Sequence, residues 1–440
     1  MDLWISGNYI EDLIPFPVKL WPGKGNPFFE SFFGFELPDT PQGLADFWDE
    51  NGDGIYNPLD GDHPALLQRG CDARVIPDEM IFWIFNDAAG AHSQTLGEPM
   101  QMEFQVTAFG FDQDHFEYST FYKYKLINRG PETLSDAYFG MWVDPDLGCH
   151  IDDAIGSDSL RNMWFLYNKG NMDGEENCTC PDGVIPYCEE IPMLGMDIIR
   201  GPLDENGDEL GMSSFAYYQS WPTISFPAAT TEPQTPEEFY NYLKGLWRDG
   251  SPITASGSGY QTSNQTICCA YPRSNPNIFG PCDSLPDSDR KIIQATGPMT
   301  FLSGATNELI LGVVYVPDIE YPCPNIAELN RADDIIQAVF DDCISVLTSV
   351  ENTQEEPVND IIIAPNPFSK TNHTELNISN LPQKSTIRIF DINGKIVKNF
   401  GQVTGHSISW TPKFSLSGGV YFVAVSDNNE RKVLKWVYSK

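Results

Sequence analysis

The sequence has few basic residues and no long apolar run. It carries 26 Lys and Arg against 62 Asp and Glu, a formal net charge of -36 at pH 7. Such an acidic chain is repelled by nucleic acid and by anionic membranes, which argues against both as main partners. No segment reaches the roughly 18 apolar residues that a membrane-spanning helix needs. Residues 1–13 also lack the basic and apolar regions of a signal peptide. If the protein is exported, we expect its signal peptide to be missing from this sequence.

The motifs of common enzymes are also absent. The chain contains no HExxH, no GxSxG and no P-loop, and only six histidines. Of these, His150 is a candidate metal ligand, although a lone histidine in a polar loop is more often solvated. A glycosidase-like carboxylate pair could be chosen almost anywhere among so many acids, so it carries little weight. Four aromatic residues could stack on sugar rings, although core packing is their more usual role: Trp221, Tyr240, Tyr242 and Trp247.

Charge divides the chain into two parts. Residues 361–440 hold ten Lys and Arg against four Asp and Glu, a net charge of +6. The remaining 16 basic and 58 acidic residues give residues 1–360 a net charge of -42. A change of this size is typical of a domain boundary. We therefore predict an acidic region over residues 1–350, a polar linker over 351–360 and a basic domain over 361–440.

The pattern of apolar residues predicts a mainly β protein. Gly (36) and Pro (34) are frequent and aromatics reach 12%, which suits short strands joined by tight turns. Residues 80–87 suggest a buried strand. Residues 101–109 and 119–128 alternate between an apolar face and a polar face that we expect to be solvent-exposed, and 137–143 suggest a further strand. Residues 168–300 look mostly like loop with one short helix over 236–247, and 325–347 form an amphipathic helix. We expect a large acidic β-sandwich-like region with long loops and one C-terminal helix, followed by a small immunoglobulin-like β-sandwich.

All ten cysteines lie in the acidic part of the chain. An even number in a loop-rich acidic sequence predicts disulfides and an oxidising compartment, although the pairing cannot be deduced from sequence. Zinc bound by Cys178, Cys180 and Cys188 is the alternative. It is disfavoured because the paired CxxC spacing of zinc sites is missing.

The last eighty residues show six short strand patterns, over 376–378, 386–391, 395–400, 407–410, 420–425 and 432–437, with a two-residue hairpin turn at Asn393-Gly394. They also carry several motifs in a fixed order. These are Pro365-Asn-Pro-Phe368, Ile389-Phe-Asp391 with Gly394-Lys395, Ser417-Gly-Gly-Val-Tyr-Phe422, and the terminal Lys435 and Lys440. Together they resemble the type A C-terminal sorting domain of cargo of the Bacteroidetes type IX secretion system. The resemblance implies an immunoglobulin-like sandwich that the outer-membrane translocon recognises. It also implies a secreted or outer-surface location, which agrees with disulfides.

The stretch WDENGDGIYNPLDGD, residues 48–62, has the spacing of ligand positions that is typical of a calcium-binding loop. Positions 1, 3, 5, 9 and 12 counted from Asp49 are oxygen-bearing, Gly54 is at position 6, and Ile55 at position 7 offers its carbonyl. The loop resembles those of dockerins, but Pro58 and the absence of flanking helices depart from an EF-hand. We predict a Ca2+ site, with a solvated acidic turn as the alternative. Its ligands would be Asp49, Asn51, Asp53, Ile55, Asn57 and Asp60.

Two further acidic clusters follow. Five carboxylates within fifteen residues would repel one another without a cation, which predicts a second Ca2+ site, with a solvated loop as the alternative. Its ligands would be Asp144, Asp146, Asp152, Asp153 and Asp158. In the third cluster, Asp204, Asn206 and Asp208 alternate around Asn206-Gly207, and we interpret it as a hairpin turn.

The acidic region also resembles an uncharacterised module of exported Bacteroidetes proteins. The pieces that carry this resemblance name no activity: residues 3–7, 49–58, 143–153, 247–252, Asp289-Arg290 and Thr296-Gly-Pro298. The sequence favours a calcium-stabilised structural or adhesive protein of the cell surface over an enzyme. The alternatives are a secreted polysaccharide hydrolase or a carbohydrate-binding protein. We expect the type IX translocon as one partner, and surface polysaccharide or self-assembly as another.

Overall fold

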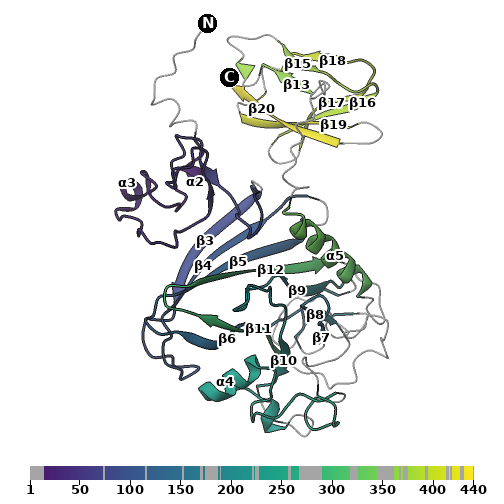
Figure 1. Ribbon diagram of the computed structural model, residues 1–440. Helices are drawn as coiled ribbons and strands as arrows, with labels where there is room; N and C mark the ends of the chain where they lie inside the picture. Colours follow the sequence, from purple (N-terminus) through teal and green to yellow (C-terminus); the bar gives the residue numbers. More distant parts are fainter. Residues whose placement is uncertain are drawn as a thin grey trace. The chain divides into compact units, whose positions relative to one another are not determined.

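The computed structural model describes residues 14–72, 75–113, 116–150, 153–168, 172–173, 187–188, 190–220, 222, 227–255, 259–266, 290–317, 326–344, 361–365, 368–369, 375–391, 395–412, 416, 419–426 and 431–439. Two compact units make up the chain, Met1–Ser349 (unit 1) and Val350–Lys440 (unit 2). Both consist mainly of β-strands, as the composition predicts (Figure 1).

Unit 1 contains a seven-stranded antiparallel sheet in the order β3-β4-β5-β12-β9-β8-β7. These strands are β3 (Glu79–Asn86), β4 (Met102–Gly110), β5 (Ser119–Asn128), β12 (Thr306–Val316), β9 (Met193–Arg200), β8 (Met163–Asn168) and β7 (Asp153–Asp158). A smaller antiparallel sheet in the order β10-β11-β6 packs on one face. Its strands are β10 (Ser214–Tyr218), β11 (Lys291–Phe301) and β6 (Leu134–Val143).

Alternation along the strands supplies two cores. In β8, Trp164 and Leu166 point into the core between the two sheets, whereas Phe165 and Tyr167 point into a second core on the opposite face. Helix α5 (Ala327–Asp341) covers this opposite face and contacts β9 and β12 (Figure 1). Helix α4 (Pro236–Leu243) contacts β6 and β11 instead. Both helices were predicted, and both are shorter than the apolar pattern indicated.

The N-terminal segment forms a further layer on the α5 side of the large sheet. It includes α2 (Phe16–Lys19), α3 (Phe29–Phe33), β1 (Phe47–Trp48) and β2 (His63–Pro64). The polar face that we expected β4 and β5 to expose lies beneath it, so that expectation was wrong. Lys123 is 5% exposed, and its Nζ lies 2.7 Å from Asp46 and 3.2 Å from Glu308. Gln105 is equally buried and donates to the carbonyl of Gly43.

Two other expectations for unit 1 were also wrong. Strand β3 lies at the edge of the large sheet, and most of it is exposed rather than buried. Residues 168–300 contain β9, β10 and most of β11, where we expected mainly loop. The apolar runs of these strands are short and interrupted, for example by Gly195 and by Gly297-Pro298. In these segments turn-forming residues therefore outweighed the alternating apolar pattern, and the sequence predicted a loop.

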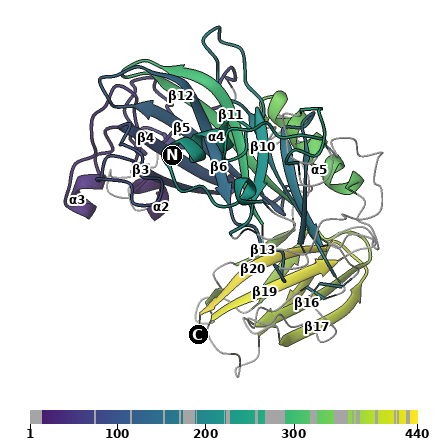
Figure 2. The ribbon, with the colours of Figure 1, turned by 90° about the horizontal axis from the view of Figure 1, so that it is seen from below.

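Unit 2 is a two-sheet sandwich of the kind that the sequence predicts. One sheet contains β13 (Ile362–Ala364), β15 (Leu376–Ser379) and β18 (Ser407–Trp410). The other contains β14 (Phe368–Ser369), β20 (Arg431–Ser439), β19 (Gly419–Ser426), β16 (Ser385–Asp391) and β17 (Ile396–Val403) (Figure 2). Phe368 of the Pro365–Phe368 motif is fully buried, and its ring packs against Trp436 and Tyr438. The predicted linker 351–360 and the turn at Asn393-Gly394 lie outside the described residues.

Candidate functional site

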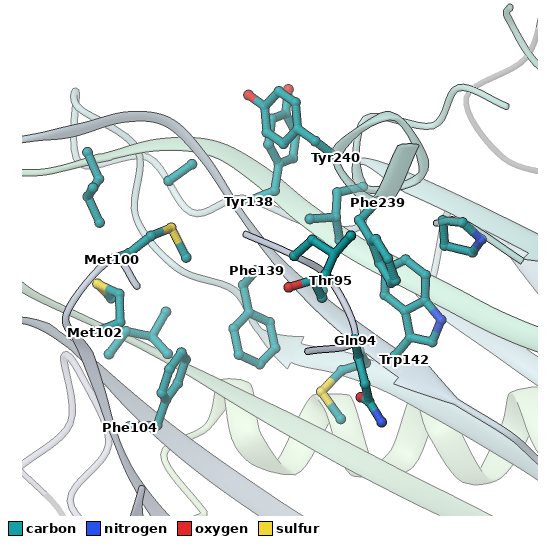
Figure 3. A pocket seen from close by; sticks show the side chains of 18 of the residues that line it. Gln94, Thr95, Met100, Met102, Phe104, Tyr138, Phe139, Trp142, Phe239 and Tyr240 are labelled. Carbon is teal, nitrogen blue, oxygen red and sulfur yellow. The ribbon is translucent and has the colours of Figure 1, made fainter. Parts of the chain in front are cut away.

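A groove of about 1430 Å³ opens in unit 1 where the large sheet extends beyond the small one. Strands β4 and β5 supply Met102, Phe104, Tyr124 and Leu126 to one wall. The opposite wall consists of β6 and residues of α4 (Figure 3). Ten lining residues are aromatic: Phe85, Phe104, Tyr124, Tyr138, Phe139, Trp142, Tyr218, Phe239, Tyr240 and Phe301. The groove is therefore mainly apolar, with polar side chains at intervals.

The open edge of β6 borders the groove. Every residue from 133 to 142 lines it, although side chains of a strand point alternately to opposite faces. Both sets can line one groove only if the edge of the strand faces that groove. The other edge of β6 pairs with β11, and no second described strand pairs with β6.

Hydrogen bonds and ring contacts hold the aromatic side chains of the groove in place. The Tyr240 hydroxyl donates to the carbonyl oxygen of Asp136 at 2.6 Å and lies 2.8 Å from its Oδ2. Burial, together with the hydrogen bond to the Asp136 carboxylate, raises the pKa of Tyr240 to about 12. The Trp142 indole donates to the Tyr218 hydroxyl at 2.9 Å, and its ring centroid lies 5.2 Å from that of Phe239. The wall is thus partly ordered before any ligand binds.

Of the three described aromatics among the four singled out from the sequence, only Tyr240 lines the groove. Tyr242 and Trp247 are fully buried in the core, which is the role that we considered more usual. Trp221 lies outside the described residues. The groove aromatics of β6 were missed because a half-buried strand next to a groove has the same pattern as one next to solvent.

The predicted calcium loop 49–60 is a series of tight turns. Both carboxylate oxygens of Asp49 accept backbone N–H groups, from Gly52 and Asp53 on one side and Gly54 on the other. Asn51 donates to Asp53 at 3.1 Å, so the side chains of positions 3 and 5 adjoin. Positions 9 and 12 form a separate contact, because the Asn57 amide donates to Asp60 at 2.7 Å. The backbone of Ile55 lies between these two groups in the loop.

Asp62, which follows the predicted loop, was missed. It is 2% exposed, and its carboxylate accepts the N–H groups of Glu50 and Asn57, which joins the two ends of the loop. Among the described residues, no group of three or more His, Cys, Asp or Glu side chains is arranged to hold a metal ion. A calcium ion here would also need the amide and carbonyl oxygens of the loop. The calcium site therefore stays a prediction.

The structure separates most members of the second acidic cluster. Asp144 lies 3.4 Å from Lys291, whereas Asp158 is fully buried and lies 2.8 Å from Arg161. Asp153 accepts the N–H of Leu147. Asp153 and Asp158 are the two ends of β7, a strand buried along its whole length, so this part of the cluster is not the solvated loop of the alternative interpretation. Asp146 also has an interaction partner within the protein. Asp152 lies outside the described residues.

The third cluster forms the predicted turn. Asp204 accepts the N–H groups of Asn206 and Asp208, and Gly207 adopts φ 86°, which favours glycine.

The cysteines that the structure describes form disulfides, as predicted. Cys71 and Cys343 are bonded to each other across 272 residues of sequence, and Cys149 and Cys188 are each part of a disulfide. Cys188 is therefore no thiolate ligand, which removes one member of the alternative zinc set. The other two members, Cys178 and Cys180, lie outside the described residues.

A buried carboxyl pair lies beneath α5 and was not anticipated. Asp197 of β9 and Asp333 of α5 are 1% and 2% exposed. Both oxygens of Asp197 and Oδ1 of Asp333 lack a donor when the two groups are ionised. Burial and the neighbouring Asp333 raise the pKa of Asp197 well above its ordinary value. Burial, with Asp334 and Asp158 nearby, raises the pKa of Asp333 to about 7. The pair therefore retains its protons to a higher pH than exposed aspartates do.

Comparison with known proteins identifies the tail. Residues 362–439 match the family model described as a secretion system C-terminal sorting domain. No curated protein matches the sequence. One similar solved structure is PorZ, described as an essential bacterial surface component of the type-IX secretion system of Porphyromonas gingivalis. The two are 20% identical over 20% of this chain and 13% of PorZ, with a TM-score of 0.18, so the likeness carries no argument.

None of the helices in the described part of the chain is long and apolar enough to cross a membrane. The sorting domain predicted from the tail motifs is confirmed. The chain is cargo of the type IX secretion system, carries its sorting domain at residues 362–439, and is secreted or attached to the outer surface.

Proposed function

We propose that this protein is an adhesive component of the cell surface that binds an extended ligand in the groove of unit 1 without cleaving it. The size and lining of the groove carry the proposal. Pockets for small molecules usually enclose about 300–1,000 Å³. A groove of about 1430 Å³ with ten aromatic side chains is larger and suits a segment of a polymer.

The distribution of carboxylates favours binding over hydrolysis. Asp136 and Glu232 are the two carboxylates among the described lining residues. Asp136 is hydrogen-bonded to Tyr240, whereas the charge of Glu232 acts on Tyr218 and Lys291. A glycosidase needs two carboxyl groups facing each other across the scissile bond. The different neighbours of Asp136 and Glu232 argue for separate roles.

A binding and turnover experiment tests this function. We would incubate the purified chain with neutral polysaccharides and with peptide pools, and measure both retention and released reducing ends. We expect saturable retention of one class and no released ends. Release of reducing ends that Asp136→Asn or Glu232→Gln abolishes would establish a hydrolase and contradict the proposal.

We also propose that Ca2+ stabilises unit 1 through the loop 49–60. Asp49, Asn51, Asp53, the Ile55 carbonyl, Asn57 and Asp60 would supply the oxygens, and glycines at φ 76° and 75° allow the turns. Two observations support the proposal. The spacing of the oxygen-bearing residues matches that of calcium-binding loops, and the first three of the proposed ligand side chains, Asp49, Asn51 and Asp53, share one turn. The second acidic cluster is the weaker candidate, because Asp144 and Asp158 pair with cations of the protein.

Thermal unfolding with EDTA and then with added calcium tests the calcium proposal. A ligand at a hundredfold excess over its dissociation constant stabilises the folded state by about 2.7 kcal/mol. We expect calcium to raise the unfolding midpoint and Asp53→Ala to remove most of the rise. The matched control is Asp208→Ala, in the exposed turn 204–208, which should keep it. An unchanged midpoint in the unmutated protein would reduce the loop to a solvated turn.

A further inference from the structure

We propose that the ligand of the groove is an extended peptide strand of another protein, which pairs with the open edge of β6. This inference rests on the proposed function, because it names the ligand class of the same groove. The strand would become the fourth strand of the small sheet. It would carry apolar side chains at every second position and basic or uncharged residues elsewhere.

The backbone of β6 provides the first part of the argument. The strand has ten residues, and β11 uses only one of its two edges. Alternate N–H and C=O groups of Ala137–Val143 therefore point into the groove, which is the arrangement that an added strand recognises, whereas the Asp136 carbonyl already accepts the Tyr240 hydroxyl. The segment 93–96 also lines the groove, but no hydrogen bond between described residues joins it to β6.

The facing wall provides the second part. A strand beside β6 would direct one set of its side chains towards Met102, Phe104 and Tyr124 of the large sheet (Figure 3). Its other side chains would point away from that sheet. Met100, Met102 and Met141 all line the groove, and flexible thioethers adapt to side chains of different shapes. This apolar, adaptable lining suits alternating aliphatic or aromatic residues better than the hydroxyl groups of a sugar.

Charge narrows the choice of partner. The described lining residues include Asp136 and Glu232 but no Lys, Arg or His. A strand with basic residues at its ends would complement these two carboxylates. A second copy of unit 1 is disfavoured, because residues 1–360 carry a net charge of -42 and two copies would repel each other. We therefore infer a different protein as donor of the strand.

A peptide pool tests the inference on the full chain. The probe is a fluorescent set of dodecapeptides with Val, Ile, Phe or Tyr at alternate positions, Thr between them and Lys at both ends. We expect saturable binding by fluorescence polarisation. Leu96→Lys and Met100→Lys introduce a positive charge at side chains of the groove that are 62% and 55% exposed, so folding should not be affected. Each should weaken binding of the Lys-ended peptides at least tenfold, and the control Leu302→Lys, equally exposed outside the groove, should leave it unchanged.

Backbone pairing gives a second and more specific signature. Methylation of the peptide nitrogens at every second position should weaken binding at least tenfold in one register and little in the other. Only one set of amides faces β6. Hydrogen exchange of residues 134–143 should slow in the complex.

Three outcomes would overturn the inference. These are no binding by any member of the pool, equal binding by both methylated registers, or unchanged exchange in β6. If cellohexaose binds instead and Met100→Lys weakens its binding, the inference fails while the adhesive function stands. Cleavage of cellohexaose would contradict both the inference and the proposed adhesive function.

Discussion

The carboxyl pair under α5 should make unit 1 less stable as pH rises towards neutrality. Asp197 and Asp333 face each other between β9 and α5, with Asp158, Arg161 and Asp334 as the other charged groups at this contact. One arginine is present for four carboxyl groups. Two buried carboxyl groups in contact cannot both ionise without a large penalty, so the folded state retains protons that the unfolded chain has lost.

The sign and size follow from linkage. In the unfolded chain Asp333 loses its proton near its ordinary pKa of 3.8, whereas in the folded state it does so at about 7. Between these values the folded state binds more protons, so the free energy of unfolding falls as pH rises. The difference amounts to about 4 kcal/mol in total at 1.36 kcal/mol per pKa unit. Of this, about 2 kcal/mol is lost between pH 5.5 and 8.5. Asp197, whose pKa is also raised, adds to the loss.

Urea denaturation across this pH range measures the effect. All ten cysteines lie between positions 71 and 343, so the transition that reduction shifts belongs to unit 1. Surface carboxylates are already ionised above pH 5.5, and 1 M salt screens their mutual repulsion without reaching the buried pair. The double variant Asp197→Asn/Asp333→Asn should have a nearly constant free energy of unfolding. The control Asp341→Asn, an exposed carboxylate of the same helix, should keep the wild-type slope.

Stability that is constant or rises from pH 5.5 to 8.5 in the unmutated protein would refute this reasoning. It would mean that the pair ionises at little cost, as it would if water reached it. A double variant with the wild-type slope would assign the slope to other groups.

Three further predictions concern unit 1. Replacing Cys71 and Cys343 by Ser opens a loop of 272 residues and should cost about 5 kcal/mol by the chain-entropy estimate, measured by urea denaturation. Lys123→Met leaves Asp46 and Glu308 without their cation and should lower the free energy of unfolding by about 3–5 kcal/mol. Adding Asp46→Asn should restore part of this free energy, and the absence of any restoration would argue against the ion pair. Gly201→Ala places a Cβ 1.6 Å from the Leu210 carbonyl oxygen and should lower the unfolding midpoint strongly, whereas Gly110→Ala, with open space around it, should change it little.

Strands with clear alternation were predictable from the sequence. The six strands expected in the tail appear as β15 to β20, with ends within three residues. In unit 1, the alternating run 119–128 coincides with β5. A side chain pattern of period two identifies the strand, because it depends only on local geometry.

The sequence did not show which segments of the chain cover each face of the large sheet. The lysines of β5 suggested solvent, yet the segment 42–67 covers them and supplies Asp46 as partner to Lys123. Conversely, the run at 80–87 suggested burial, yet Ile81 is 65% exposed on an edge strand. Both errors arise from contacts between distant parts of the chain, which local pattern does not encode.

The candidate site combines these two kinds of information. The apolar pattern at 137–143 predicted most of β6. Whether β6 can bind a ligand depends on its position at the edge of the small sheet and on how far the large sheet extends beside it, which the pattern does not show. Edge strands usually carry charges or bulges that prevent unwanted pairing. The portion Ala137–Trp142 of β6 carries no charged side chain and is half-buried throughout, whereas Asp136 brings a carboxylate and a positive φ of 55° to the start of the strand. An edge that is unprotected over six residues beside an apolar groove is hazardous for an isolated domain and useful for a secreted adhesin. This contrast is why we place the ligand at β6 rather than at the acidic loops.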